Sequence, residues 1–273
     1  MTLRVEHAGL SDPGRVRDRN EDSWMADPRR GLYIVSDGIG GELAGDVASR
    51  AVVEALPGLV TRSLGEAPDP GAVETLQHVK EAICELSGQI RDQTRHEPGL
   101  EGMGATVVLA LVRGACAVIA YLGDSRAYRL REGRLEQLTQ DHTIVRLLVD
   151  RGEIAPDEAA AHPSRGQLTR AVGMEGECLP ESARIDLQSG DRLLLCTDGL
   201  VDMLSDEEVG SILGDRAPPA STCRRLVDAA NAAGGKDNIT AVVLDISNPP
   251  QGHAVDAPGE ALRKTTKIGV DPA

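Results

Sequence analysis

The chain has 273 residues and a formal net charge of −14, from 29 basic and 43 acidic side chains. So acidic a chain is a poor candidate for binding nucleic acid or an anionic membrane surface, although bound cations could still give a carboxylate-rich site affinity for a phosphate. Aromatic residues make up only 1% of the sequence and phenylalanine does not occur, so the hydrophobic core must be aliphatic.

The cysteines and the apolar segments indicate where the protein resides. The five cysteines are scattered and form no C-x-x-C pair, which indicates buried free thiols in a reducing compartment. Residues 1–6 contain no apolar signal segment, and the longest apolar stretch, residues 105–112, is far shorter than the ~20 residues of a membrane span. We therefore expect a cytoplasmic protein with no membrane or nucleic-acid partner.

The first hundred residues contain two predicted strands and then two predicted helices. Short apolar runs bounded by turn residues indicate strands, and apolar residues three or four apart indicate amphipathic helices. Between the two strands, residues 15–23 carry dense charge of both signs, as a solvated loop does. In chain order, the strands cover residues 3–10 and 32–35, and the helices cover residues 43–59 and 73–90.

Four strands then follow in series with short turns between them, as in an antiparallel meander. From residue 139 the apolar spacing becomes helical, and insertions of this kind often act as lids or binding elements. The strands cover residues 105–112, 115–122, 126–130 and 135–138, and the helical segments cover residues 144–152, 156–161 and 168–172.

The C-terminal part closes the pattern. Ser205 and Glu208 form a capping box that opens a helix. Residues 248–273 are polar and interrupted by proline and glycine, so we expect a disordered tail after a single domain of residues 1–247. The remaining elements are a strand end and turn at 187–191, a strand at 193–197, helices at 205–213 and 218–233, and a strand at 239–246.

The order of these elements favours the α+β class. The helices come in pairs rather than one after each strand, which argues against a doubly wound parallel sheet. We expect antiparallel sheets with helices packed outside them.

Four aspartates stand where an apolar segment gives way to a turn. Taken singly, an aspartate before a glycine is most simply a turn residue. Brought together with Glu21 and Asp22, these acids would repel one another unless a hard cation such as Mg²⁺ or Mn²⁺ bound them. The sequence contains no zinc-type spacing of His and Cys, no nucleotide P-loop and no G-x-S-x-G. The four are Asp37, Asp124, Asp198 and Asp237.

Eight short motifs in a fixed order carry a resemblance to a known family. Together they are similar to those of the PPM family, the metal-dependent serine/threonine protein phosphatases of the 2C type, in its bacterial branch. The match runs from about residue 5 to residue 246. The motifs are RDRNED (17–22), SDGIGG (36–41), GMGAT (102–106), GDSR (123–126), LTQDH (138–142), LTRAVG (168–173), CTDG (196–199) and DNIT (237–240).

The resemblance implies an αββα sandwich, with two central antiparallel sheets flanked by helices, and a centre of two Mn²⁺ or Mg²⁺ ions with a third, weaker ion. By position, Asp37 would bridge the two principal ions. Asp198 and Asp237 would complete one of them, and Glu21 with the carbonyl of Gly38 would complete the other.

Further roles follow from the same resemblance. Asp124, together with Asp198, corresponds to the third, weaker ion. Asp22 and Asn238 would support the ligands from behind. Arg17 corresponds to the residue that grips the substrate phosphate. Residues 143–167 correspond to a flap beside the site.

The implied activity is hydrolysis of phosphoserine and phosphothreonine in proteins, by direct attack of a hydroxide that bridges the ions. Catalysis would fall to Arg17, Asp37 and Asp198. The implied partners are phosphorylated proteins and a bacterial Ser/Thr kinase that the enzyme would oppose, and we expect a monomer.

One position departs from the eukaryotic members of the family. Ile39 stands where they carry a histidine thought to protonate the leaving group, and an isoleucine cannot donate a proton. Two replacements stay open: a water on the Asp124 ion, and His142. The alternative for His142 is a packing role at a helix start beside Asp141.

Two other readings of the chain stay open. The fold could serve as a binding or scaffolding protein with a degenerate centre, although the intact acids argue against this. Residues 264–267, Lys-Thr-Thr-Lys, could be a phosphorylation or docking site, or simply part of an unstructured end.

Overall fold

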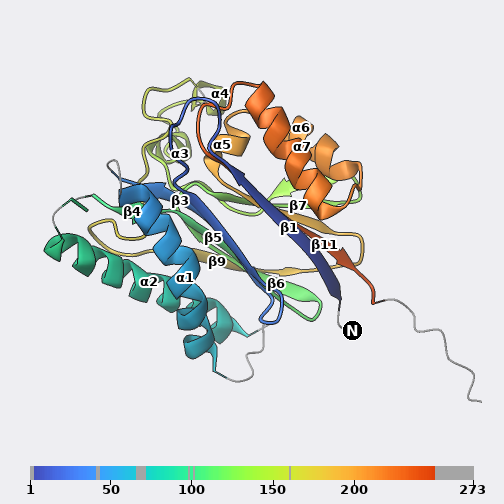
Figure 1. The fold of residues 1–273 in the computed structure, drawn as a ribbon, viewed down its shortest axis with the longest axis horizontal. Helices are drawn as coiled ribbons and strands as arrows, with labels where there is room; N and C mark the ends of the chain where they lie inside the picture. Colours follow the sequence, from blue (N-terminus) through green and yellow to red (C-terminus); the bar gives the residue numbers. More distant parts are fainter. Residues whose placement is uncertain are drawn as a thin grey trace, which may run out of the picture.

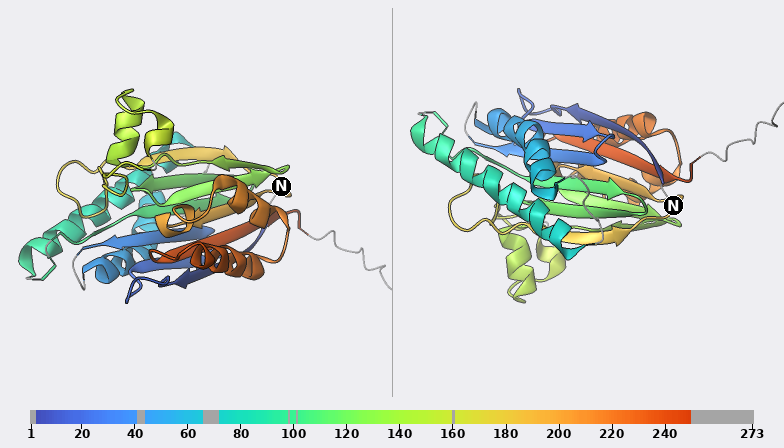
Figure 2. Two further views of the ribbon diagram at one scale, coloured as in Figure 1. Left: turned by 90° about the horizontal axis from the view of Figure 1, so that it is seen from above. Right: turned by 90° about the horizontal axis from the view of Figure 1, so that it is seen from below.

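The structure is a computed structural model that describes residues 3–40, 44–65, 72–97, 99–100, 102–159 and 161–249. Two antiparallel β-sheets pack face to face at its centre, and helices cover both outer faces (Figures 1 and 2). The expected α+β class and the αββα arrangement are therefore confirmed.

The first sheet, here called the β11 sheet, has the strand order β1-β11-β10-β7-β8. All of its neighbouring strands pair antiparallel. Its strands are β1 (Arg4–Asp12), β7 (Arg126–Arg131), β8 (Arg134–Gln137), β10 (Arg192–Cys196) and β11 (Ile239–Ser247).

The second sheet, here called the β3 sheet, has the order β2-β3-β5-β6-β9, and the short β4 also pairs with β3. Its pairings are antiparallel as well. Its strands are β2 (Asp22–Asp27), β3 (Leu32–Ile39), β4 (Gly104–Ala105), β5 (Val107–Arg113), β6 (Cys116–Leu122) and β9 (Glu181–Asp186).

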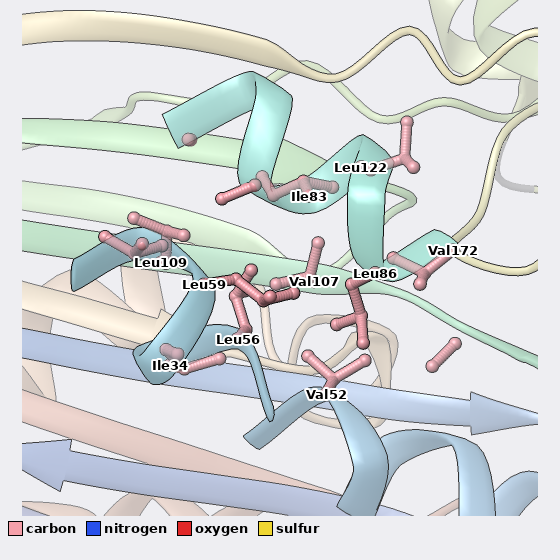
Figure 3. Packing of buried hydrophobic residues seen from close by; sticks show 14 of the residues in the cluster. Ile34, Val52, Leu56, Leu59, Ile83, Leu86, Val107, Leu109, Leu122 and Val172 are labelled. Atoms are coloured by element: carbon pink, nitrogen blue, oxygen red, sulfur yellow. The ribbon is translucent and has the colours of Figure 1, made fainter. Parts of the chain in front are cut away.

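The alternation of side chains along β3 explains the layers. Leu32 and Ile34 belong to the cluster packed under one pair of helices, whereas Tyr33 and Val35 belong to the cluster between the sheets. Because successive side chains of a strand point to opposite faces, a strand buried on both faces must be apolar throughout. Figure 3 shows the outer cluster, to which α1 contributes Leu56, α2 contributes Ile83 and β5 contributes Leu109.

The helices divide between the two outer faces. Helices α1 and α2 cover the β3 sheet, and α5, α6 and α7 cover the β11 sheet (Figure 1). Two short helices, α3 and α4, lie in the segment between β8 and β9. The bounds are α1 (Ala44–Leu64), α2 (Val73–His96), α3 (Ile144–Asp150), α4 (Pro156–Ala159), α5 (Asp198–Val201), α6 (Asp206–Gly214) and α7 (Pro219–Ala232).

Most predicted elements are confirmed, including the capping box, in which Ser205 accepts from the Glu208 amide. The helix predicted over residues 168–172 is wrong. That segment is extended, and Val172 exchanges backbone hydrogen bonds of 2.8 and 3.0 Å with Ala105. Gly173, with a φ of +85°, ends the segment. The short apolar spacing resembles that of a helix. The backbone N–H and C=O groups of this segment instead find partners in a neighbouring segment of the chain.

Other differences concern strand and helix limits. Strand β2 lies partly in the stretch predicted as a solvated loop, and β9 precedes the predicted strand end. Helix α1 continues to Leu64 although Pro57 and Gly58 suggested an end near residue 59.

Some expectations fall outside the described residues: Gly41 and Leu43, residues 66–71, whose two prolines predict a loop, and residues 250–273, which include the 264–267 sequence and most of the expected tail. Within the described ranges, no helix is both long and apolar enough to cross a bilayer. All five cysteines are free thiols; three are buried, while Cys84 and Cys178 are half-buried.

Candidate metal centre

The predicted acids gather at one end of the two sheets. Strand β3 carries Asp37 near its end, Asp198 lies two residues after β10, and Asp237 lies two residues before β11. Because β10 and β11 are antiparallel neighbours, with Cys196 opposite Ala241, the end of one strand lies beside the start of the other. Asp22, the first residue of β2, pairs directly with Asp37.

These carboxylates are close enough to perturb one another. Burial raises the pKa of Asp37 well above its usual range, and four neighbouring carboxylates raise that pKa further. Like charges cannot all stay ionised at such separations unless a cation offsets them. In order of effect, these neighbours are Asp22, Asp198, Asp124 and Asp237.

Asp124 and Asp198 behave in the same way. Burial raises the pKa of Asp124 well above its usual range, with Asp198 as the next cause. Burial also raises the pKa of Asp198, with the charge of Asp237 as the next cause. The structure therefore brings the four predicted aspartates into one electrostatic cluster.

Asp22 is a buried acid of the group. Burial raises its pKa to about 7, although hydrogen bonds from Thr240 and Thr197 lower it. The hydroxyl groups of Thr240 and Thr197 donate to Oδ2 of Asp22 at 2.7 and 2.9 Å. Since Thr240 belongs to β11 and Thr197 directly follows β10, Asp22 ties the two sheets together beside Asp37.

The donor set fits a hard divalent cation. Oδ1 of Asp22 and Oδ1 of Asp198 are buried and have no hydrogen-bond partner. Uncompensated carboxylate oxygens are costly in such surroundings, and Mg²⁺ and Mn²⁺ prefer oxygen ligands. In the part of the chain that the structure describes, no three His, Cys, Asp or Glu side chains already enclose a common point. Water and carbonyl oxygens would therefore have to complete the coordination, as is usual for Mg²⁺.

Glu21 and the Gly38 carbonyl meet at the first turn of α1. A Cβ atom on Gly45 would lie 2.7 Å from Oε2 of Glu21 and 3.0 Å from the Gly38 oxygen. A Cβ on Gly38 would lie 2.0 Å from the Gly45 oxygen, so neither position has room for a side chain. Burial, ahead of neighbouring charges, raises the pKa of Glu21. These two oxygen donors thus lie side by side, as the predicted second ligand pair requires.

Asn238 clamps the loop that carries Glu21 and Arg17. Its Oδ1 accepts from the Glu21 amide at 2.8 Å, and its Nδ2 donates to the carbonyls of Pro13 and Arg19 at 3.0 and 2.8 Å. Both donors and the oxygen of the Asn238 side-chain amide therefore bind the backbone of the loop. The loop can lie close to the backbone of Asp237 because residue 14 is a glycine. Gly14 has a φ of +82°, and a Cβ atom there would lie 2.2 Å from the backbone carbonyl oxygen of Asp237.

Arg17 reaches from this loop into the acidic cluster. Its Nη2 donates to Oδ2 of Asp237 at 2.7 Å, while 56% of the Arg17 side chain stays exposed. The hydrogen bond and the charge of Asp237, with Glu21 and Asp37 behind them, raise the pKa of Arg17. Arg17 is thus an exposed cation in contact with the cluster.

Several residues that shape the site had no predicted role. Thr106 accepts from the Asp37 amide at 2.9 Å and shares a hydrogen bond of 2.6 Å with Ser125, next to Asp124. Thr197 and Thr240, which hold Asp22, belong to the same class. All four lie inside the motifs quoted above, but their roles depend on contacts between distant segments.

His142 lies beside the cluster with both ring nitrogens engaged. The Gly123 amide donates to Nδ1 at 3.1 Å, so the ring proton of the neutral form sits on Nε2, 3.2 Å from Oε1 of Glu181. Burial lowers the pKa of His142, and the ring stacks on Tyr121 at 5.2 Å. This geometry favours the packing alternative over a role as general acid.

Comparison with known proteins agrees with this geometry. Residues 15–242 match the family described as Protein phosphatase 2C. The chain is 41% identical to the serine/threonine protein phosphatase PstP of Mycobacterium tuberculosis over 90% of this chain, and covers 46% of PstP, about half of its length. It is 37% identical to the serine/threonine phosphatase stp of Listeria welshimeri over 86% of this chain and 93% of stp.

Solved structures show the same fold. The crystal structure of the M. tuberculosis PstP matches with a TM-score of 0.80 and 40% identity, covering 90% of this chain and 100% of that one. A structure of the PstP catalytic domain in complex with 2 manganese ions matches with a TM-score of 0.77 and 37% identity, with the same coverage. With its acids gathered at one end of paired antiparallel sheets and a family match that spans most of its length, the chain belongs to the protein phosphatase 2C family.

Proposed function

We propose that this protein is a metal-dependent protein serine/threonine phosphatase that hydrolyses phosphoserine and phosphothreonine. The observation that carries the proposal is the meeting of Asp37, Asp198 and Asp237 from three strand ends, with the exposed Arg17 in contact with the cluster. Relatives named serine/threonine phosphatases support it.

The acids would hold two Mn²⁺ or Mg²⁺ ions. Asp37 would bridge them, Asp198 and Asp237 would serve one, and Glu21 with the Gly38 carbonyl would serve the other. The structure with 2 manganese ions in a relative supports this metal count. Bound metal would supply a nucleophilic water of lowered pKa and offset charge on the phosphoryl group.

Three further residues would contribute to the surroundings of these two metal ions. Asp124 would contribute to a third, weaker ion site together with Asp198, the neighbour that most affects its pKa after burial. Asp22 and Asn238 would hold the ligands in place through the hydrogen bonds described above.

Arg17 would bind the phosphate of the substrate. A guanidinium group is cationic at all relevant pH values and offers parallel donors that match two phosphate oxygens. Its exposure leaves it accessible to a protein substrate, and its contact with Asp237 holds it beside the acids. It would neutralise charge that develops on the transferred group.

The leaving alkoxide needs a proton, and the Ile39 side chain cannot supply it. Because both nitrogens of His142 are engaged, we propose that a water near Asp124 is the donor.

The biological setting remains part of the proposal. The substrates would be phosphorylated proteins, and the enzyme would oppose a Ser/Thr kinase as a cytoplasmic monomer. Residues 1–247 would form the phosphatase domain and residues 248–273 a tail.

Metal-dependent turnover tests this function. The purified protein, stripped with EDTA, should hydrolyse p-nitrophenyl phosphate and a phosphothreonine peptide only after Mn²⁺ is added. Asp198→Asn should lose at least about 100-fold in turnover because one ligand charge is removed. Asp215→Asn, an exposed acid paired with Arg225 at the end of α6, is the matched control and should keep wild-type turnover. Turnover by Asp198→Asn equal to that of the wild type would contradict the proposal, as would full turnover in EDTA.

A further inference from the structure

A cavity of about 640 Å³ opens beside the metal centre, under the segment that holds α3 and α4. Figure 2 shows these two yellow-green helices projecting away from the sheets. The volume falls in the range of about 300–1,000 Å³ that is usual for ligand pockets. Asp124 and Asp198 are among the residues that line the cavity, so it adjoins the proposed metal site.

The charged side chains in the rest of the cavity are already paired. Arg126 forms a bidentate ion pair with Asp141, with N···O distances of 2.7 to 3.2 Å. Arg165 forms an ion pair with Asp202, the residue that ends α5. The third lining cation, Arg146, pairs with an acid on its own helix at 2.8 Å. No cation among the described lining residues is left over for a second phosphate or an acidic side chain.

The apolar side chains of the lining come from three separate elements. Helix α3 contributes Val145 and Val149, α4 contributes Pro156 and Ala159, and α5 contributes Val201. An aliphatic occupant would remove these surfaces from water, whereas an acidic one would lose its hydration without meeting an unpaired cation of the lining.

The position of the cavity determines what can reach it. With a phosphate at the metal centre, an extended peptide advances about 3.3 Å per residue, so a residue two positions away lies roughly 7 Å farther along and on the same face. The chain that carries the phosphate can therefore place a neighbouring side chain between α3 and α5.

We propose that this cavity is a peptide subsite that selects phosphoproteins with an aliphatic residue two positions from the phosphorylated residue. The proposal rests on the proposed phosphatase function and names a substrate feature of the same site. Val149, which is half-buried and lies on the cavity wall, would be the main determinant of this selectivity.

Helix α3 offers a matched pair of variants. Val149→Glu places a charge in the cavity, whereas Leu147→Glu places the same charge on a side chain that is 40% exposed and does not line the cavity. The wild type and both variants are assayed with Mn²⁺ on p-nitrophenyl phosphate and on phosphothreonine peptides. The peptides carry Leu, Ala or Asp at each of the two positions on either side of the phosphothreonine. p-Nitrophenyl phosphate has no peptide and cannot reach the subsite.

The wild type should hydrolyse the best Leu peptide with a kcat/KM about tenfold higher than that of the Ala peptide, mainly through KM, and the Asp peptide least well. Val149→Glu should abolish the preference for Leu while p-nitrophenyl phosphate turnover stays within about twofold, and Leu147→Glu should change neither. Equal rates of the wild type on Leu, Ala and Asp peptides would overturn the subsite, whether or not the variant folds. An equal loss of both substrates in a folded Val149→Glu would also overturn it. The complete lack of Mn²⁺-dependent turnover of p-nitrophenyl phosphate by the wild type would instead overturn the phosphatase function, and the subsite with it.

Discussion

The hydroxyl of Thr240 donates a hydrogen bond of 2.7 Å to Oδ2 of Asp22, a residue in the other sheet and 218 positions away in the chain. A hydroxyl has one proton, so Thr240 must in turn accept from Ser11, whose oxygen lies 2.7 Å away. Ser11 accepts from the amide of Asn20 at 2.8 Å. A single chain of donors thus runs from the Arg17 loop to the acid opposite Asp37.

Replacing Thr240 should weaken the metal site without removing a ligand. Thr240→Val keeps the shape of the side chain but leaves Asp22 with one donor and Ser11 without its acceptor. We expect the Mn²⁺ dissociation constant, measured by titration calorimetry, to rise about 10- to 100-fold, and the free energy of unfolding to fall by about 1–2 kcal/mol.

Thr61→Val is the control, because Thr61 donates only to a carbonyl of its own helix on the exposed face of α1. Thr240→Ser should restore most of the affinity. Equal Mn²⁺ affinities of Thr240→Val and the wild type would show that the inter-sheet bond has no part in the metal site.

Arg17 should affect turnover more than metal binding. Arg17→Ala removes the exposed cation in contact with the acidic cluster, and we expect kcat/KM for p-nitrophenyl phosphate to fall by about 100-fold. Arg17→Lys should recover part of this loss, since a lysine keeps the charge but not the paired donors. The Mn²⁺ dissociation constant should not rise, because the Arg17 guanidinium pairs with Asp237 and its positive charge repels a metal ion.

The control for Arg17 is Arg50→Ala, which breaks an exposed ion pair with Asp46 on α1. Surface pairs of this kind contribute little, so its kinetics should match the wild type. A loss of activity in Arg17→Ala that higher Mn²⁺ restores in full would contradict a role in phosphate binding.

The sequence was most informative where the signal was local. An apolar run that ends in an aspartate and a turn is visible in consecutive residues, and the strands that carry Asp37, Asp124 and Asp198 were predicted for that reason. That these aspartates gather at one end of the two sheets was implied only by the resemblance, because no local sequence pattern indicates which strand ends meet. Burial and mutual repulsion then account for the raised pKa of Asp37.

The parts that sequence reasoning missed depend on contacts between distant residues. Strand β2 is polar at Asp22, Ser23 and Asp27, so its composition indicates a loop, and it is a strand only because β3 pairs with it. Thr240 carries no local sign that its partner is Asp22. The same holds for the bond between His142 and Glu181, 39 positions apart, which occupies the candidate acid.

The metal-free protein should gain stability as the pH falls from about 8 to about 6. The pKa of Asp22 is raised to about 7, and those of Asp37 and Asp124 are raised well above the ordinary value near 4. In this window the folded chain binds more protons than the unfolded chain, so the free energy of unfolding falls as the pH rises. We expect the Tm in EDTA to be higher at the lower pH by about 3 °C or more.

The variant Asp37→Asn separates this effect from the general charge of the chain. By removing one of the repelling charges, it should raise the metal-free Tm at the higher pH and flatten the pH dependence, while it abolishes Mn²⁺-dependent turnover. Asp215→Asn removes the same charge from an exposed position and should have none of these three effects. A metal-free Tm that falls steadily as the pH drops from about 8 to about 6 would contradict the raised pKa values.

Arg192 should be essential for stability but not for chemistry. It is 1% exposed at the start of β10, at the end of that strand away from Asp198, and it lies opposite Asp245 of β11. Its guanidinium pairs with Asp245 at 2.7 Å and donates to the carbonyls of Leu213 and Ala217 at 3.0 and 2.7 Å. The arginine therefore joins both strands to the end of α6 and to the segment between α6 and α7.

Arg192→Met leaves the Asp245 carboxylate without its partner, and we expect a loss of about 3–5 kcal/mol in the free energy of unfolding in urea. The double variant Arg192→Met/Asp245→Leu should recover part of that loss, because the unpaired charge is gone. The kcat of the folded fraction should stay near the wild-type value in both. Arg225→Met, which breaks the exposed pair with Asp215, should cost less than about 1 kcal/mol. Equal losses for Arg192→Met and Arg225→Met would mean that the buried network does not hold the α6–α7 layer on the β11 sheet.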